Sequence, residues 1–171
     1  MNVLIYVNNL KNKADKYAEE LISALDKNGI SYSFIDNDNL DKSVDADCIF
    51  VFGGDGTILN LTDFCLKNDI PIIGINAGNI GFLAEFEVKE IEESVKFLKD
   101  GKLTKDNRLV LIANYGGKEY LALNDCVISR IYKENYTGLL VNLDVCIDDK
   151  PVASIKGDGA IISTPTGSTA Y

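Results

Sequence analysis

The sequence contains no histidine. This absence excludes a Ser-His-Asp triad and every histidine-ligated metal site, so any proton transfer must use a carboxylate, Lys, Tyr, Cys or water. Cysteine is scarce, and the four residues are too far apart for a CxxC redox pair or a metal-binding knuckle. We expect all four to be small buried side chains: Cys48, Cys65, Cys126 and Cys146.

Basic residues and long apolar runs are also few. Seventeen Lys and Arg against twenty-six Asp and Glu give a net charge of −9, whereas nucleic-acid binders usually carry a basic surface. The clearest apolar run, residues 48–52, is far shorter than the roughly 20 residues that span a bilayer. Residues 1–7 lack the basic start of a signal peptide. We therefore expect a cytoplasmic protein with no nucleic-acid partner and no membrane partner.

What is present is typical of a globular protein, since 46% of the 171 residues are apolar and 25% are charged. In the first hundred residues, short apolar runs alternate with segments of helical spacing. This alternation predicts an α/β fold for residues 1–102, a doubly wound parallel sheet with helices on both faces. The predicted strands are 3–7, 32–35, 48–52 and 72–75, and the predicted helices are 12–28, 57–67 and 87–99.

The pattern changes near residue 103, where antiparallel signals begin. Residues 108–114 and 119–123 flank Gly116-Gly117 and predict a hairpin. Apolar residues alternate with polar ones over 139–147, and further strands are predicted at 151–155 and 160–162. Residues 103–171 are thus expected to form the beginning of an all-β domain. Because the last residues form a hydroxyl- and glycine-rich loop, we expect a fragment of a longer enzyme, or a unit completed by another chain.

The segment Gly53-Gly54-Asp55-Gly56-Thr57 follows a predicted strand and precedes a predicted helix. Glycine lets a backbone approach a ligand closely, and free N–H groups at a helix start suit phosphate oxygens. A carboxylate there fits a proton acceptor for a hydroxyl, or a partner of a divalent cation, so phosphoryl transfer to an alcohol is a candidate reaction. The alternative is a plain strand-to-helix turn with Asp55 as the helix N-cap.

A second loop, residues 76–83, follows the next predicted strand. Its amides could bind ribose hydroxyls, and Phe82 with Leu83 could line a base pocket. The alternative is an ordinary loop whose apolar residues anchor it to the core.

Two further segments could bind a ligand. Asn124-Asp125 could bind base amino groups or ribose hydroxyls, although such a pair is often a turn. Near the end of the chain, one lysine and several hydroxyls could bind phosphate, or they belong to a β-turn and a polar loop: Lys156, Thr166, Ser168 and Thr169.

These segments, in this order, resemble the NAD kinase family. The matching pieces are 53–57, 76–82, 124–125, 157–159 and 164–171, and the resemblance covers the whole chain but only about the first two thirds of the usual family length. The resemblance implies phosphorylation of the 2′-hydroxyl of the adenosine ribose of NAD to give NADP. The phosphoryl donor would be ATP or polyphosphate, with a divalent cation such as Mg²⁺, and the protein would form homodimers or homotetramers.

The resemblance also implies roles for individual residues, with none of them a metal ligand. Asp55 matches the proton acceptor. The other matching positions are substrate-binding residues in the family. In the nucleotide loops they are Gly53, Gly54, Gly56, Thr57, Asn76 and Phe82, and in the adenosine site they are Asn124 and Asp125. At the nicotinamide end they are Lys156 and Asp158, and in the adenine-side pocket they are Thr166, Thr169, Ala170 and Tyr171. Asp125 stands where the family usually has Glu.

Two other functions are compatible with the sequence. Lipid and sphingoid-base kinases share the first loop, but they would need an apolar substrate slot or a basic patch, and the sequence indicates neither. A non-catalytic nucleotide-binding module is the other alternative.

Overall fold

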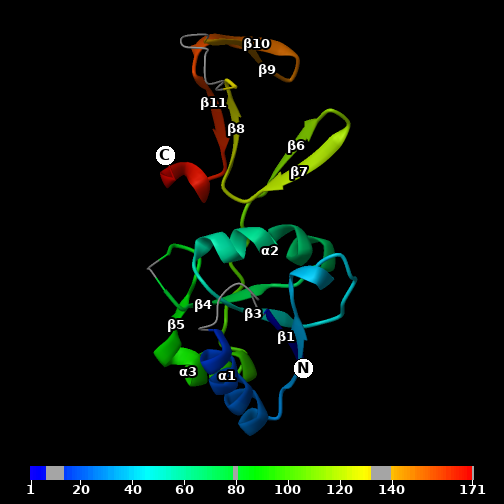
Figure 1. The fold of residues 1–171 in the computed structure, drawn as a ribbon, viewed down its shortest axis with the longest axis vertical. Coiled ribbons are helices and arrows are strands. Elements are labelled where there is room, and N and C mark those ends of the chain that lie inside the picture. The colour runs from blue at the N-terminus through cyan, green and yellow to red at the C-terminus, as the bar shows by residue number, and fades with distance from the viewer. Residues whose placement is uncertain (7–13, 79–80, 132–139, 171) are drawn as a thin grey trace. The chain divides into compact units, whose positions relative to one another are not determined.

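The computed structural model describes residues 1–6, 14–78, 81–131 and 140–170 (Figure 1). It consists of two compact units, Met1–Asn107 and Arg108–Tyr171, which are considered separately below. The sequence places the domain boundary between residues 102 and 103. Parts of some predicted elements lie outside the described residues, namely 7, 12–13, 79–80 and 139, as does the predicted site residue Tyr171.

The first unit, unit 1, is built on a five-stranded sheet in which all strand pairs are parallel. The strands lie in the order β2-β1-β3-β4-β5, and every residue of β3 is buried. Parallel strands that are buried on both faces consist of continuous apolar runs, which is the pattern the sequence shows there. The bounds are β1 Asn2–Tyr6, β2 Ser31–Ile35, β3 Cys48–Phe52, β4 Ile72–Asn76 and β5 Phe86–Glu87.

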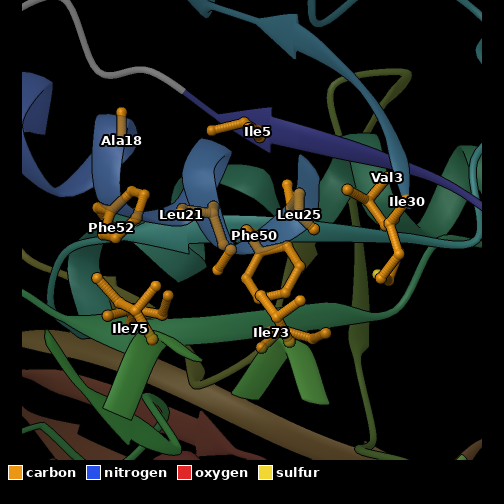
Figure 2. Close-up of a cluster of buried hydrophobic side chains, with 14 residues drawn as sticks. Val3, Ile5, Ala18, Leu21, Leu25, Ile30, Phe50, Phe52, Ile73 and Ile75 are labelled. Atoms are coloured by element: carbon orange, nitrogen blue, oxygen red, sulfur yellow. The ribbon is translucent and has the colours of Figure 1, made fainter. Parts of the chain in front are cut away.

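Helices cover both faces of this sheet, as the sequence predicts. Helix α1 (Ala14–Asn28) and helix α3 (Ile91–Lys99) pack on one face, and α2 (Asp55–Asn68) packs on the other (Figure 1). Because successive strand residues point to opposite faces, Val3 and Ile5 belong to the core under α1 and α3, whereas Leu4 belongs to the core under α2. Figure 2 shows the first of these two cores.

The predicted boundaries differ from the structure at two of these helices. Helix α2 begins at Asp55, two residues before the predicted start, so Asp55 lies in the first helical turn. A 3-10 helix, η2 (Val88–Glu90), precedes α3 where one continuous helix is predicted. The short strand β5 is absent from the prediction, because two residues give too little periodicity to detect.

The second unit, unit 2, consists of antiparallel strand pairs, as expected. The β6–β7 hairpin turns at Gly116 and Gly117, whose φ angles of 58° and 76° are accessible to glycine at little cost. One strand, β8, is missing from the prediction. The bounds are β6 Leu111–Tyr115, β7 Lys118–Ala122, β8 Asp125–Ser129, β9 Val141–Ile147, β10 Lys150–Gly157 and β11 Gly159–Ser163.

All four cysteines are free thiols. Cys48 and Cys65 are buried, as predicted. Cys126 is partly buried, and Cys146 is exposed, so the expectation of burial is wrong at Cys146. Within the described part of the chain, no helix is both long and apolar enough to cross a membrane.

Candidate functional site

Both glycine-rich loops of unit 1 begin at the carboxyl edge of the sheet. Strands β3 and β4 are parallel neighbours with Phe52 opposite Ile75, so the residues that follow them emerge side by side. The Gly53 N–H donates to the Ile75 carbonyl at 3.0 Å, which extends the strand pairing into the first loop. The strand order reverses between β1 and β3, and open α/β sheets bind ligands at the carboxyl edge next to such a reversal.

The first loop turns directly from β3 into α2. A Cβ atom on Gly53 would overlap the Thr57 hydroxyl and lie 2.7 Å from the Thr57 Cβ, so only glycine fits there. Gly54 is the helix N-cap and Gly56 is exposed. The Thr57 N–H donates to the Gly54 carbonyl at 2.9 Å, and the N–H groups of Asp55 and Gly56, which come before it in the first turn, are the candidate donors at this edge. The alternative in which Asp55 is the N-cap is wrong, because Gly54 occupies that position.

The Asp55 carboxylate joins the two loops. Its Oδ2 accepts a hydrogen bond from the Phe82 backbone N–H and its Oδ1 accepts one from the Leu83 N–H, each at 3.0 Å. These bonds bridge 27 and 28 residues of sequence. Each oxygen has further acceptor capacity, so the carboxylate is oriented without being saturated. Asp55 is partly exposed, which leaves it accessible to a ligand.

Two large apolar side chains of the second loop, Phe82 and Leu83, lie in different environments. Leu83 packs against the core under α2, as an apolar staple would, whereas the Phe82 side chain is 86% exposed. Asn76, at the end of β4, accepts the Gly78 N–H at 3.0 Å through its side-chain oxygen and so closes a tight turn. The structure therefore brings together Asp55 and the backbone of Phe82 and leaves the Phe82 ring available for a ligand.

In unit 2, the Asn124-Asp125 pair lies beside the hydroxyl-rich segment. Asp125 pairs with Ser163 in the β8–β11 ladder, and the Thr164 N–H donates to the Asn124 carbonyl at 2.8 Å. A Cβ on Gly167 would lie only 2.6 Å from the Asn124 Cα, so the two backbones are in close contact. The predicted residues Thr166, Thr169 and Ala170 follow in and around the 3-10 helix η3 (Gly167–Thr169).

Thr164 connects these segments through hydrogen bonds, and the sequence analysis did not single it out as a functional residue. Its side chain is 3% exposed. The hydroxyl donates to the Leu123 carbonyl at 2.6 Å and accepts the Gly167 N–H at 3.1 Å. The sequence signal was its position directly after an apolar strand, but a hydroxyl there is equally consistent with a solvent-exposed loop.

Arg108 is a second residue that the sequence reasoning missed. Its Nη1 donates to the Thr166 hydroxyl at 3.3 Å. Thr166 is among the residues expected to bind the substrate, so this places a fixed positive charge beside the hydroxyl-rich segment. The sequence offered one signal that could have identified Arg108, namely that arginine occurs at only two positions in the chain.

Asp158 lies just beyond the opposite end of the same ladder, and Lys156 lies on the preceding strand β10, opposite Asn142 of β9. Gly159 pairs with Ser129, whereas Asp125 pairs with Ser163. Four residue steps separate the two ends, or roughly 14 Å at the usual rise. Asp158 forms an ion pair with Arg130, with 3.0 Å between Arg130 Nε and Asp158 Oδ1, while Lys156 is exposed on β10. The structure thus divides the predicted residues of unit 2 into two groups.

The described segments contain no group of three or more Cys, Asp or Glu side chains that could hold a metal ion. A Mg²⁺ ion commonly binds through one or two carboxylates together with substrate phosphates and water. Asp55 is the carboxylate at the edge described above, so the residues fit a cation that is bound together with a nucleotide rather than one held by the protein alone.

Comparison with known proteins identifies the family. Residues 40–103 match the family model "ATP-NAD kinase N-terminal domain", and residues 123–171 match "ATP-NAD kinase C-terminal domain". The NAD kinase of Clostridium botulinum (strain Loch Maree) is 38% identical over 144 residues, which cover 81% of this chain and 50% of that protein. The NAD kinase of Petrotoga mobilis is 33% identical over 175 residues, which cover 100% of this chain and 62% of that protein.

A solved structure, an NAD kinase from Archaeoglobus fulgidus in complex with ATP, matches with a TM-score of 0.76 and 26% identity. The match covers 100% of this chain and 64% of that one. The chain spans half to less than two thirds of the length of the relatives described here. The models of both family domains match this chain in order, and the relatives are similar to it over most or all of its length. The chain therefore belongs to the NAD kinase family.

Proposed function

We propose that the protein transfers a phosphoryl group to the 2′-hydroxyl of the adenosine ribose of NAD and so produces NADP, with ATP or polyphosphate as the donor. Family membership supports the substrate class, and the relative with ATP bound supports ATP as the donor. The observation that carries the proposal is the Asp55 carboxylate, oriented by two backbone N–H groups at the carboxyl edge of the sheet.

Asp55 is the proton acceptor in this proposal. As the bond between the ribose 2′-oxygen and the γ-phosphorus forms, the bond from that phosphorus to the β,γ-bridging oxygen breaks, and ADP leaves. The hydroxyl proton passes to Asp55. Because phosphoryl transfer depends mainly on positioning and charge neutralisation, an oriented carboxylate is enough for the proton step, and the chain has no histidine to share it.

The loop glycines would provide backbone contacts to the nucleotides. Gly53, Gly54 and Gly56 surround the start of α2, where N–H donors face the edge of the sheet, and Thr57 fixes the turn from within. Asn76 and the exposed Phe82 ring would contact ribose and base. A divalent cation such as Mg²⁺ would bind together with the nucleotide phosphates and neutralise their charge.

The two groups of residues in unit 2 suit different parts of a dinucleotide. Asn124, Asp125 and the 166–171 segment would bind the adenosine portion. Lys156 on β10 and Asp158 just beyond the other end of the ladder would serve the nicotinamide end or an interface between subunits. A cytoplasmic homodimer or homotetramer is part of this proposal.

The test is the substitution Asp55→Asn, with Asp63→Asn as the matched control. Both residues lie on α2, but Asp63 is exposed and forms an ion pair with Lys67, at 2.7 Å. The Asp55→Asn variant removes the proton acceptor, so we expect NADP formation from NAD, ATP and Mg²⁺ to fall by about 10²–10⁴-fold. NAD binding, measured by calorimetry, should change far less, and the control should match the unsubstituted protein.

Equal rates for Asp55→Asn and the unsubstituted protein would refute the assignment of Asp55. If the unsubstituted protein binds NAD but produces no NADP, the non-catalytic nucleotide-binding module is the correct function. Phosphorylation of a lipid in place of NAD would identify the alternative kinase class.

A further inference from the structure

Gly81 lies directly against the Asp55 carboxylate. A Cβ atom added at Gly81 would overlap Oδ1 of Asp55 and lie 2.8 Å from its Cγ, with no other atom as close. The φ angle of Gly81 is outside the left-handed region that favours glycine. The backbone conformation therefore does not require glycine at this position. Glycine is required because the carboxylate occupies the space that a side chain would need.

The segment that carries Gly81 is fixed on its other side. A Cβ on Gly74 of β4 would lie 2.9 Å from the Ala84 Cα, so the backbone at Ala84, three residues after Gly81, passes very close to the strand. Leu83 and Ala84 also pack against the core under α2. A methyl group at position 81 cannot push this backbone away from the carboxylate without disturbing that packing. The Asp55 side chain is the element that would move.

Movement of the carboxylate would break its hydrogen bonds. Its two oxygens accept the Phe82 and Leu83 N–H groups at 3.0 Å, and bonds of this type depend steeply on distance and angle. The same bonds set the direction in which the remaining lone pairs of Asp55 point.

We propose that Gly81 is a positioning residue for Asp55: the missing side chain lets the carboxylate lie against the 81–83 backbone, where two N–H groups orient it toward the reacting hydroxyl. This inference rests on the proposed function, because orientation matters only if Asp55 accepts a proton. Gly81 itself contributes no group to the proton transfer or the phosphoryl transfer.

The first experiment is a double-mutant cycle on folding. Gly81→Ala, Asp55→Ala and the double variant are unfolded in urea. In the presence of Asp55, Gly81→Ala should lower the folding equilibrium constant by at least about tenfold, since charge-assisted hydrogen bonds are lost. In the Asp55→Ala background, the same methyl group meets no carboxylate and should cost almost nothing. Equal costs in both backgrounds would overturn the proposal.

Gly78→Ala is the matched control for this folding measurement. Gly78 lies in the same loop and also lacks a left-handed φ angle, but a Cβ there meets no atom within 4 Å. We expect its folding equilibrium constant to match that of the unsubstituted protein. A loss as large as that of Gly81→Ala would show that the loop tolerates no side chain anywhere, and would contradict a specific contact with Asp55.

The second experiment separates kcat from KM in NADP formation. A displaced proton acceptor lowers kcat, and a misplacement of about 1 Å can cost roughly a hundredfold, so this is the loss expected for Gly81→Ala. The KM for NAD should change less than about threefold, because the substitution replaces none of the residues proposed to bind NAD. A change in KM alone, or an unchanged kcat, would overturn the positioning role.

The experiments distinguish a failure of the proposed function from a failure of the role proposed for Gly81. If the unsubstituted protein forms no NADP, the proposed function fails, and the folding cycle still reports whether Gly81 and Asp55 are coupled. If NADP forms and Asp55→Asn abolishes it while the cycle shows no coupling, the function stands and the role of Gly81 is refuted.

Discussion

Cys48 and Cys65 show how the environment of a single residue changes its chemistry. Burial raises the pKa of each thiol to about 12, from an ordinary value of 9.0, and the nearby Asp47 carboxylate adds to the effect at Cys48. Both thiols therefore stay protonated and unreactive near neutral pH, since the thiolate is the reactive form. Cys146, which is exposed, has no such protection from reagents.

These pKa values predict a loss of stability in alkali. Above about pH 9 the thiols of the unfolded chain ionise, whereas the buried thiols stay protonated until about pH 12, so the unfolded state binds fewer protons. The free energy of unfolding should then fall with rising pH, by about 1.4 kcal/mol per pH unit for each thiol. Burial also raises the pKa of Tyr6, which acts in the same direction.

Urea unfolding over this alkaline range measures the slope. The Cys65→Ala variant should show a shallower slope than the unsubstituted protein because it lacks one of the two thiols. The same slope in both proteins would show that the Cys65 thiol is not protected by burial.

At the scale of elements, strands β8 and β11 are joined beyond their ladder by Thr164. The bend between β7 and β8, at Leu123 and Asn124, contains neither glycine nor proline. Its carbonyl groups are instead satisfied by the Thr164 hydroxyl and N–H. Thr164, about 40 residues away in sequence, therefore stabilises this bend, a function that a residue within the turn usually has.

The substitution Thr164→Val tests this role. Valine keeps the shape but removes the hydroxyl, which leaves the Gly167 N–H and the Leu123 carbonyl without this partner. We expect the free energy of unfolding to fall by about 1–3 kcal/mol, and NAD affinity measured by calorimetry to fall with it. Thr164→Ser is the control, because it retains the hydroxyl. A valine variant as stable as the unsubstituted protein would contradict the assignment.

At the scale of the whole molecule, the two units differ in how they are stabilised. Every buried hydrophobic side chain of the described residues lies between Val3 and Val95, in unit 1. In the described part of unit 2, the strands leave large apolar side chains exposed, among them Ile161 and Ile162. Burial of apolar area is the main favourable contribution to folding, so the stability of this chain resides mainly in unit 1.

Hydrogen exchange on the whole chain should reveal this difference. Backbone amides of β1 and β3 should exchange most slowly, and those of the β6–β7 and β9–β10 hairpins much faster. Leu21→Ala, which opens a cavity against the sheet, should lower protection throughout unit 1 and leave unit 2 unaffected. Equal protection in the two units of the unsubstituted protein would contradict this expectation.

Sequence reasoning succeeded where the signal is local. The apolar run at 48–52 and the helical spacing within 12–28 identified β3 and α1, and the glycines around Asp55 indicated the strand-to-helix turn. Strand β8 was missed because its separation from β7 depends on Thr164, about 40 residues further along the chain. Cys146 was assigned wrongly because alternation in β9 does not say which face is covered.

The sequence by itself determined the alternation of strands and helices, the parallel sheet of unit 1 and the residue types available for proton transfer, because backbone geometry and hydrophobic periodicity act over a few neighbouring residues. Only the tertiary structure decided that the Phe82 and Leu83 N–H groups bind the Asp55 carboxylate, that Gly81 lies against that carboxylate, and that Lys156 and Asp158 lie apart from Asn124. Each of these facts depends on contacts between residues distant in sequence. Such contacts are set by the packing of whole elements, which no local pattern encodes.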